Sequence, residues 1–355
     1  MMRARRGFTL IEMMIALVVS LVVVAGLYGI FTLQSRQFYY QDLQMEMHQN
    51  MRFATDVLTR SIRMAGFNTS AMVTGWGGTE GADDSINALP AVQSYDDWSG
   101  DGHDAIAVVY GDPSLVVSST MMFVEECDTT GISFLTDMLD FDDKLAEYES
   151  GDLLLCLDYA AIGGMESYLW VITSVDASDP TYTRLGISGA YGTSDYDAVC
   201  PSGENLTPVM SCSKAEVTTF YIDSTDDGVG PGSPENPVLM MDMDLGWPES
   251  DDVPLVEHVE DLQVDYCLDD GGGTSDCSSS GAWTSTIDMT AGDVPWMVRT
   301  SLVIRSSRED YARVYTGTRP ALSNHDAAFD SDHYYRQVLV SSVTARNLRI
   351  QSVIP

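Results

Sequence analysis

The sequence has little positive charge and none of the common catalytic motifs. Its 355 residues include 18 lysines and arginines against 53 aspartates and glutamates, which gives a net charge of -35. A surface this acidic repels phosphate backbones, so we expect no nucleic-acid partner. The five histidines show no H-E-x-x-H spacing, and the chain has no P-loop, G-x-S-x-G or G-x-G-x-x-G motif. We therefore expect a binding or structural protein, not an enzyme.

Proline is also absent from the first part of the chain, where Pro90 is the first. A helix can therefore run through this part without a break, since proline removes a backbone donor and clashes with the preceding turn. Apolar residues recur with a period near 3.6 beyond the first 40 residues, and Gly66 follows as a helix-ending residue. The stripe consists of Leu43, Met47, Met51, Ala54, Leu58, Ile62 and Ala65. We predict one helix from Phe8 to Ala65.

Cysteine is absent until Cys127, and no pair of cysteines has the C-x-x-C spacing of zinc or redox sites. An even number of six cysteines favours disulfides in an oxidising compartment, with reduced core thiols as the alternative. A disulfide between Cys267 and Cys277 would close a glycine-rich loop. We expect that pair first, then Cys200 with Cys212, which leaves Cys127 with Cys156.

A short basic leader precedes an apolar run that is long enough to cross a membrane. The run from Phe8 to Phe31 spans roughly 36 Å as a helix, and the arginines before it favour a cytoplasmic start. A cleaved secretory signal would need a small-residue site after the run, and residues 24–26 form only a poor one. A twin-arginine signal at Arg5-Arg6 would also end at a cleavage site and not in a continuous helix.

Glu12 lies inside this apolar run and needs an explanation of its own. A carboxylate near the membrane interior costs about 2.5 to 3.5 kcal/mol unless it finds a partner. Cleavage after Gly7 would give Phe8 a free amino group at a similar depth. Because that amine cannot easily fold back onto Glu12 of its own helix, we expect the amine of a neighbouring subunit to pair with it. A carboxylate that snorkels to the membrane surface is the alternative.

The rest of the chain predicts an α+β fold, in which the long amino-terminal transmembrane and amphipathic helix packs on an antiparallel β-sheet head with large loop-rich insertions. Short runs of β-branched and aromatic residues predict strands at 105–110, 115–124, 153–157, 168–175, 217–222, 259–268, 298–306 and 338–348. We expect a helical turn at 141–148. Glycine, proline and acidic clusters predict loops at 69–102, 176–213 and 223–252. A sheet and an amphipathic helix each have one apolar face to bury. We expect a leader at 1–7, a transmembrane helix at 8–33, an amphipathic helix at 34–66, a β-rich and loop-rich region at 67–252, and a final sheet at 253–355.

Two acidic loops share a D-x-[ST]-x-D-G pattern. Alternating oxygen ligands before a glycine turn are how calcium loops begin, although both loops lack the acidic residue at the twelfth position. We expect no cofactor, with calcium as a possible ligand of these loops and ordinary acidic turns as the alternative. The candidate ligands are Asp97, Ser99 and Asp101 in the first loop, and Asp223, Thr225 and Asp227 in the second.

The order of basic leader, Gly7, Phe8-Thr9-Leu10-Ile11-Glu12 and long apolar helix resembles the signal of type IV pilins and of type II secretion pseudopilins. Segments at 61–67, 259–266 and 335–348 resemble the PilW family of minor pilins, whereas the middle of the chain resembles no family. This resemblance implies cleavage by prepilin peptidase after Gly7, N-methylation of Phe8 and a role for Glu12 in filament assembly.

The resemblance further implies a minor pilin of the type IV pilus, in the complex that initiates the filament and sits at its tip. Its partners would be other minor pilins and the major pilin, reached through the amino-terminal helix. It would span the inner membrane once, with a periplasmic head, before it enters the pilus. A type II secretion pseudopilin, a calcium-dependent tip adhesin and a binding protein with an uncleaved anchor are the alternatives.

Overall fold

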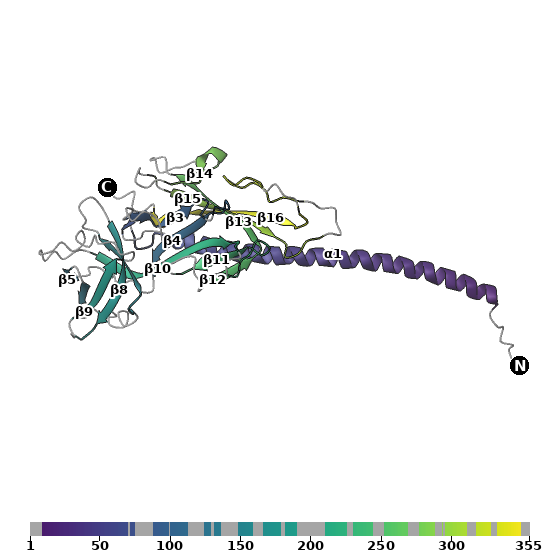
Figure 1. The fold of residues 1–355 in the computed structure, drawn as a ribbon, viewed down its shortest axis with the longest axis horizontal. Helices are drawn as coiled ribbons and strands as arrows, with labels where there is room; N and C mark the ends of the chain where they lie inside the picture. Colours follow the sequence, from purple (N-terminus) through teal and green to yellow (C-terminus); the bar gives the residue numbers. More distant parts are fainter. Residues whose placement is uncertain are drawn as a thin grey trace.

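The computed structural model describes the amino-terminal helix and most of the strands of the head. The described residues are 9–69, 72–74, 88–98, 100–112, 124–128, 131–135, 148–158, 166–178, 182–189, 210–225, 230–243, 252–268, 277–287, 293, 295–310, 317–327 and 332–348. One long helix extends from a β-rich head, and its amino-terminal half projects away from the head (Figure 1). The expected α+β, pilin-like fold is confirmed.

Helix α1 (Leu10–Met64) has 55 residues, and its carboxyl end is fixed by the last residues of the head. Gly66 follows with a φ of +77°, and a Cβ there would lie 2.5 Å from the Leu348 side chain. The Asn347 amide donates to the carbonyl oxygens of Met64 and Ala65, both at 3.3 Å. These carbonyl oxygens belong to the last turn of the helix, where no N–H group of the helix is available to donate to them. Chain segments far apart in sequence thus meet where α1 ends.

The larger sheet has twelve strands and is mostly antiparallel. Its path runs β12-β11-β10-β7-β8-β9-β6-β5, and β1 to β4 join it beside β8 and β10. The strands are β1 (Met72–Thr74), β2 (Ala88–Pro90), β3 (Val92–Tyr95), β4 (Ala105–Gly111), β5 (Val124–Asp128), β6 (Gly131–Leu135), β7 (Leu153–Asp158), β8 (Glu166–Asp176), β9 (Tyr182–Gly189), β10 (Met210–Asp223), β11 (Val238–Asp242) and β12 (Val253–Glu257).

The second sheet has four strands in the order β14-β13-β15-β16. They are β13 (Val259–Leu268), β14 (Trp283–Thr284), β15 (Pro295–Arg305) and β16 (Arg336–Thr344), and a short 3-10 helix η2 (Ser280–Ala282) precedes β14. The three long strands confirm the antiparallel sheet predicted from 259–268, 298–306 and 338–348. The chain changes from one sheet to the other at His258, which has a φ of +64°.

The predicted apolar stripe of α1 is buried between the two sheets. Met47, Met51, Ala54, Leu58 and Ile62 are all at most 5% exposed and belong to one core cluster with residues of both sheets. α1 contacts β4 and β12 of the larger sheet, and β15 and β16 of the smaller one. Each buried side chain of this size stabilises the fold by about 1.5 to 3 kcal/mol.

Several segments that the composition predicts to be loops contain strands. Residues 69–102 hold β1, β2 and β3, residues 176–213 hold β9, and residues 223–252 hold β11. These strands are short or flanked by glycine and acidic residues, so their local signal is weak, and pairing with neighbouring strands decides their conformation. Most of the strand predicted at 115–124 and most of the helical turn predicted at 141–148 lie outside the described residues.

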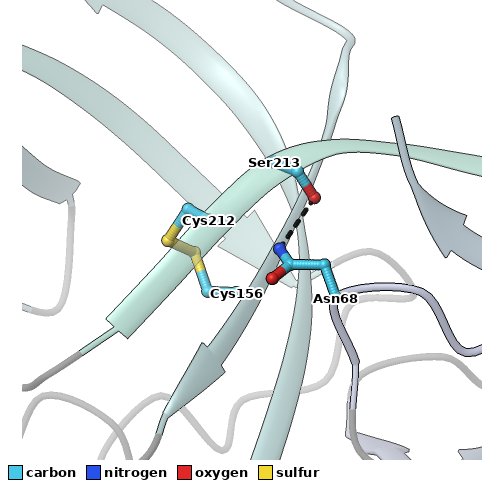
Figure 2. Close-up of a disulfide and its surroundings, with 4 residues drawn as sticks. All are labelled: Asn68, Cys156, Cys212 and Ser213. Atoms are coloured by element: carbon cyan, nitrogen blue, oxygen red, sulfur yellow. Dashed lines mark hydrogen bonds between the residues drawn. A yellow bond between two sulfur atoms is a disulfide. The ribbon is translucent and has the colours of Figure 1, made fainter. Parts of the chain in front are cut away.

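The expected pairings of Cys200 with Cys212 and of Cys127 with Cys156 are wrong, because Cys156 bonds to Cys212 (Figure 2). The two residues face each other in the register of β7 and β10, with Cα atoms 4.0 Å apart. Register across a sheet, and not closeness in sequence, selects the partner. The expected Cys267–Cys277 disulfide is confirmed. The Cys127 side chain and Cys200 lie outside the described residues.

Leu58→Ala tests whether the α1 stripe holds the head together. Leu58 is fully buried, so truncation should lower the free energy of unfolding by about 2 to 5 kcal/mol. Phe53→Ala is the control, since Phe53 is 51% exposed on the same helix and should cost less than about 0.5 kcal/mol. Thermal unfolding of the full chain in detergent measures both. Equal effects would contradict the proposed packing.

Candidate assembly site

The amino terminus of α1 holds Glu12 in a capping box with Thr9. The Thr9 backbone N–H donates to Glu12 Oε2 at 2.9 Å, its hydroxyl donates to the same oxygen at 3.0 Å, and the Glu12 N–H donates to Thr9 Oγ1 at 3.4 Å. These bonds satisfy donors that a helix start leaves without partners. A carboxylate accepts about four hydrogen bonds, so Glu12 can still take a cationic partner.

The apolar run that follows Glu12 has no cover within the described chain. Leu10 is 78% exposed and Phe31 is 68% exposed. The large apolar side chains between them are exposed to a similar extent. α1 is the one described helix that is long and apolar enough to cross a membrane. An exposed apolar surface of this size requires lipid or protein around it.

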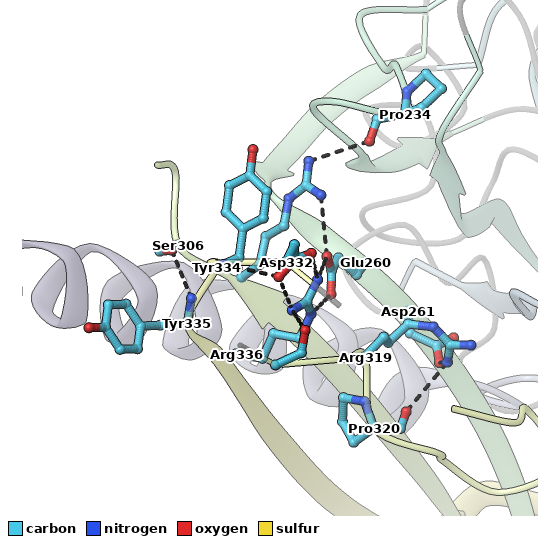
Figure 3. Close-up of polar contacts among 12 residues, drawn as sticks. Pro234, Glu260, Asp261, Ser306, Arg319, Pro320, Asp332, Tyr334, Tyr335 and Arg336 are labelled. Atoms are coloured by element: carbon cyan, nitrogen blue, oxygen red, sulfur yellow. Dashed lines mark hydrogen bonds and ion pairs between the residues drawn. The ribbon is translucent and has the colours of Figure 1, made fainter. Parts of the chain in front are cut away.

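A buried ion-pair network holds the start of β16 against β13 (Figure 3). Arg336 donates to Glu260 Oε1 at 2.8 Å and to Asp332 Oδ1 at 2.6 Å, and Arg305 donates to Glu260 Oε1 at 3.2 Å. Burial alone would lower the pKa of Arg336, but its hydrogen bonds to both carboxylates and their negative charges raise it. Removing one partner of such a buried pair costs about 3 to 5 kcal/mol.

A second cluster surrounds the fully buried carboxylate of Asp261. His103 Nδ1 lies 3.4 Å from Asp261 Oδ1, and His325 Nδ1 lies 3.0 Å from Oδ2. Gly102 approaches the His325 ring so closely that a Cβ would lie 2.4 Å from Nε2. Two histidines and an aspartate have the composition of a metal site.

Arg319 argues against a metal ion at this cluster. Its guanidinium donates to Asp261 Oδ2 at 2.7 Å and contacts His325 Nε2 at 2.7 Å. It therefore supplies the positive charge that the buried carboxylate requires. A cation bound to His325 Nδ1 would leave the ring proton on Nε2, facing an arginine N–H. The cluster thus fastens residues 319–325 to β13 as an ion pair.

The two acidic loops lie side by side, with the Ser224 hydroxyl 3.3 Å from Asp101 Oδ2. Asp97 accepts the Gly102 N–H, whereas Asp223 accepts the Thr225 N–H at 3.2 Å and the Gly232 N–H at 2.7 Å. The aspartates that begin both loops therefore stabilise turns. Ser99 and Asp227 lie outside the described residues, and calcium binding stays a prediction.

No local sequence pattern reveals the two ion-pair clusters, because their members come from segments far apart in the chain. Glu260 and Asp261 lie in a run whose alternation predicts a strand, and nothing local shows which arginines reach them. Arg299 and Arg305 pair with Asp265 and Glu260 at 2.9 and 3.2 Å, so both arginines neutralise acidic side chains of the neighbouring strand β13.

Two family models match the chain. The prokaryotic N-terminal methylation motif matches residues 2–28, which include the leader and the start of α1. The Type IV Pilus-assembly protein W model matches residues 219–347, from the end of β10 through the four-stranded sheet to the Asn347 cap. Comparisons with curated proteins and with solved structures found no match.

The methylation motif and the exposed apolar helix define a pilin-class protein that is anchored in a membrane and associated with a pilus. Within that class, the two family-model matches identify a PilW-type minor pilin of the type IV pilus. It is processed by prepilin peptidase and takes part in pilus assembly, which requires interaction with other pilus components. The PilW family consists of pilus-assembly proteins and is not a known enzyme family. That this chain catalyses no reaction stays a prediction.

Asp104 gives the head a testable pH dependence. It is 1% exposed and accepts the Val264 N–H at 2.8 Å, and burial raises its pKa to about 7. The folded state therefore favours the protonated form. Its contribution to stability is full below about pH 4, the unfolded pKa, and is lost as the pH rises to about 7.

Asp104→Asn resembles the protonated form and keeps one acceptor oxygen. We expect it to raise the melting temperature near pH 8 and to flatten the decline between about pH 4 and 7. The control is Asp56→Asn, at an exposed position of α1. Thermal unfolding of the full chain in detergent across this range measures the effect. If the variant and the native chain had the same dependence of melting temperature on pH, ionisation of Asp104 would not lower the stability of the folded state.

Proposed function

We propose that the apolar half of α1 holds the chain in the inner membrane, with the head in the periplasm, until the chain enters the pilus. The apolar half is exposed along its whole length, whereas the head buries a stripe of the other half, and this contrast is the observation that carries the proposal. During assembly, the lipid around the segment from Leu10 to Phe31 is replaced by the helices of neighbouring pilin subunits.

In this proposal, prepilin peptidase cuts after Gly7 and the new amino group of Phe8 becomes methylated. Glu12 of one subunit then pairs with the Phe8 amine of its neighbour. The capping box supports this step, since the Thr9 donors to Glu12 Oε2 hold the carboxylate at the helix start. An ion pair between subunits removes two charges from the apolar interior together, which either subunit alone cannot do.

We further propose that the chain acts in the complex that initiates the filament and sits at its tip, beside other minor pilins and the major pilin. The large size of its head favours a position at the tip over a position in the shaft. Twelve strands form the larger sheet, and β1 to β9 lie outside the matched PilW region. A head of this size is accommodated more easily at an end of a filament than in its closely packed shaft.

Glu12→Ala tests the pairing step. If the pair operates, the amount of the chain in sheared pili should fall at least about tenfold, equivalent to about 1.4 kcal/mol, while its amount in membranes stays unchanged. Glu12→Asp is the control because it keeps the charge and should retain part of the incorporation. Immunoblots of the two fractions measure the ratio. Undiminished incorporation of the alanine variant would exclude the pairing.

Mass spectrometry of the native amino terminus tests the processing residues. We expect the mature chain to begin at Phe8 with one added methyl group on its nitrogen. A bulky substitution, Gly7→Leu, should leave the leader attached, because the peptidase must accommodate the residue before the cut. A native chain that begins at Met1, or at a residue beyond the apolar run, would contradict both assignments.

A further inference from the structure

Strand β16 is a long sheet edge with none of the features that usually prevent pairing with another strand. It has nine residues, contains no proline, and pairs with β15 without a register shift. The other edge strands of the described chain are short, as β2, β3 and β14 are, or belong to pairs with a register shift, as β5 and β12 do. Native proteins rarely leave an edge of this kind unprotected.

The backbone groups of every second β16 residue face away from β15. The Ser306 N–H donates to the Tyr335 carbonyl at 2.8 Å and the Ala345 N–H donates to the Trp296 carbonyl at 3.2 Å, which places the odd-numbered residues toward β15. In an antiparallel strand, the N–H and C=O of alternate residues point to opposite sides. Val338, Val340 and Ser342 therefore present theirs at the outer edge of the sheet, where no described strand pairs with β16.

The side chains of these residues are open to solvent as well. Val338 is 40% exposed and Val340 is 54% exposed, although both lie in the middle of a strand. The odd-numbered neighbours point to α1 instead, as the 3.4 Å contact between Ser341 and Thr59 shows. An edge with free backbone groups and exposed valines is what strand addition requires.

β16 runs alongside α1 and in the same direction. The Tyr335 ring lies 5.0 Å from that of Tyr40, Ser341 contacts Thr59, and Asn347 caps the carboxyl end of the helix. A strand that pairs with β16 would therefore lie beside α1. In an assembled filament this place belongs to a neighbouring subunit, because neighbouring helices surround α1.

A second copy of this chain does not fit the edge. Two identical edges joined by a two-fold axis pair antiparallel, and this would point the two α1 helices in opposite directions. Both helices enter the same membrane in the same orientation, so such a pair cannot form before assembly. The net charge of -35 also makes two heads repel each other.

We propose that β16 receives an edge strand from the head of a different pilin-class subunit, so that one sheet continues across two heads. This rests on the proposed function, since it requires a neighbouring pilin beside α1. The arriving strand is neutral or basic, which suits an acidic head. Backbone hydrogen bonds supply the affinity, and cross-strand contact with the exposed side chains of Val338 and Val340 favours β-branched or aromatic residues.

Site-specific photo-crosslinking in cells tests the proposal with the full chain in its membrane. A photoreactive residue replaces Ser342, and in a control chain it replaces Val253, which is 36% exposed on the β12 edge next to Pro254. We expect a crosslink from position 342 to a different protein that carries an amino-terminal methylation motif. The yield from position 253 should be at least about tenfold lower.

Val340→Pro adds the specific test, because it removes an N–H that β15 does not use. The crosslink from position 342 should fall about tenfold, whereas the matched Val340→Thr, which keeps the N–H, should leave it unchanged. Val340→Lys is a second blocking variant in case proline disturbs the strand. Formation of the Cys267–Cys277 disulfide and resistance to protease confirm that each variant folds.

Three results would overturn the proposal: equal crosslinks from both positions, a crosslink to a second copy of the chain, or a crosslink partner without the methylation motif. The state of the native chain separates this failure from failure of the proposed function. If the chain with methylated Phe8 is found in sheared pili, only the strand pairing is wrong. If the chain never enters pili, both proposals fail.

Discussion

Burial of one stripe of α1 between two sheets is the interaction on which the rest of the structure depends. β4 and β12 cover the helix from one sheet, and β15 and β16 cover it from the other. Neither sheet could bury its apolar face against the helix if the stripe were narrower or the helix shorter. The end of α1 must then be fixed, and Asn347 and Gly66 fix it from opposite ends of the head sequence.

The rest of the chain does not bury the apolar side chains of this helix along its whole length. One stripe of its carboxyl-terminal half lies in the core, while the half from Leu10 to Phe31 is exposed throughout. Lipid satisfies the apolar side chains of that half but not a carboxylate. The capping box with Thr9 gives Glu12 two donors, and this lowers the cost of leaving the charge at the helix start.

How much could be predicted depended on how local each signal was. The helix, its buried stripe and the strands at 259–268 and 298–306 follow from periodicity within one segment, and the structure confirms them. The Cys156–Cys212 disulfide and the Glu260–Arg336 pair depend on register between segments about 50 to 80 residues apart, which no local pattern contains. β9 and β11 were missed for the same reason, because neighbouring strands decide their conformation.

The orientation of the head follows from how β16 and α1 are joined at both ends. Tyr335 contacts Tyr40 where the strand begins, and Asn347 holds the last turn of the helix just after the strand ends. The strand therefore cannot turn relative to the helix unless both contacts break. In the proposed assembly α1 enters the filament, so the free edge of β16 takes a fixed direction relative to the filament axis. A neighbouring subunit that packs along α1 in that assembly meets this edge in one orientation only, so helix packing also determines how the two heads meet.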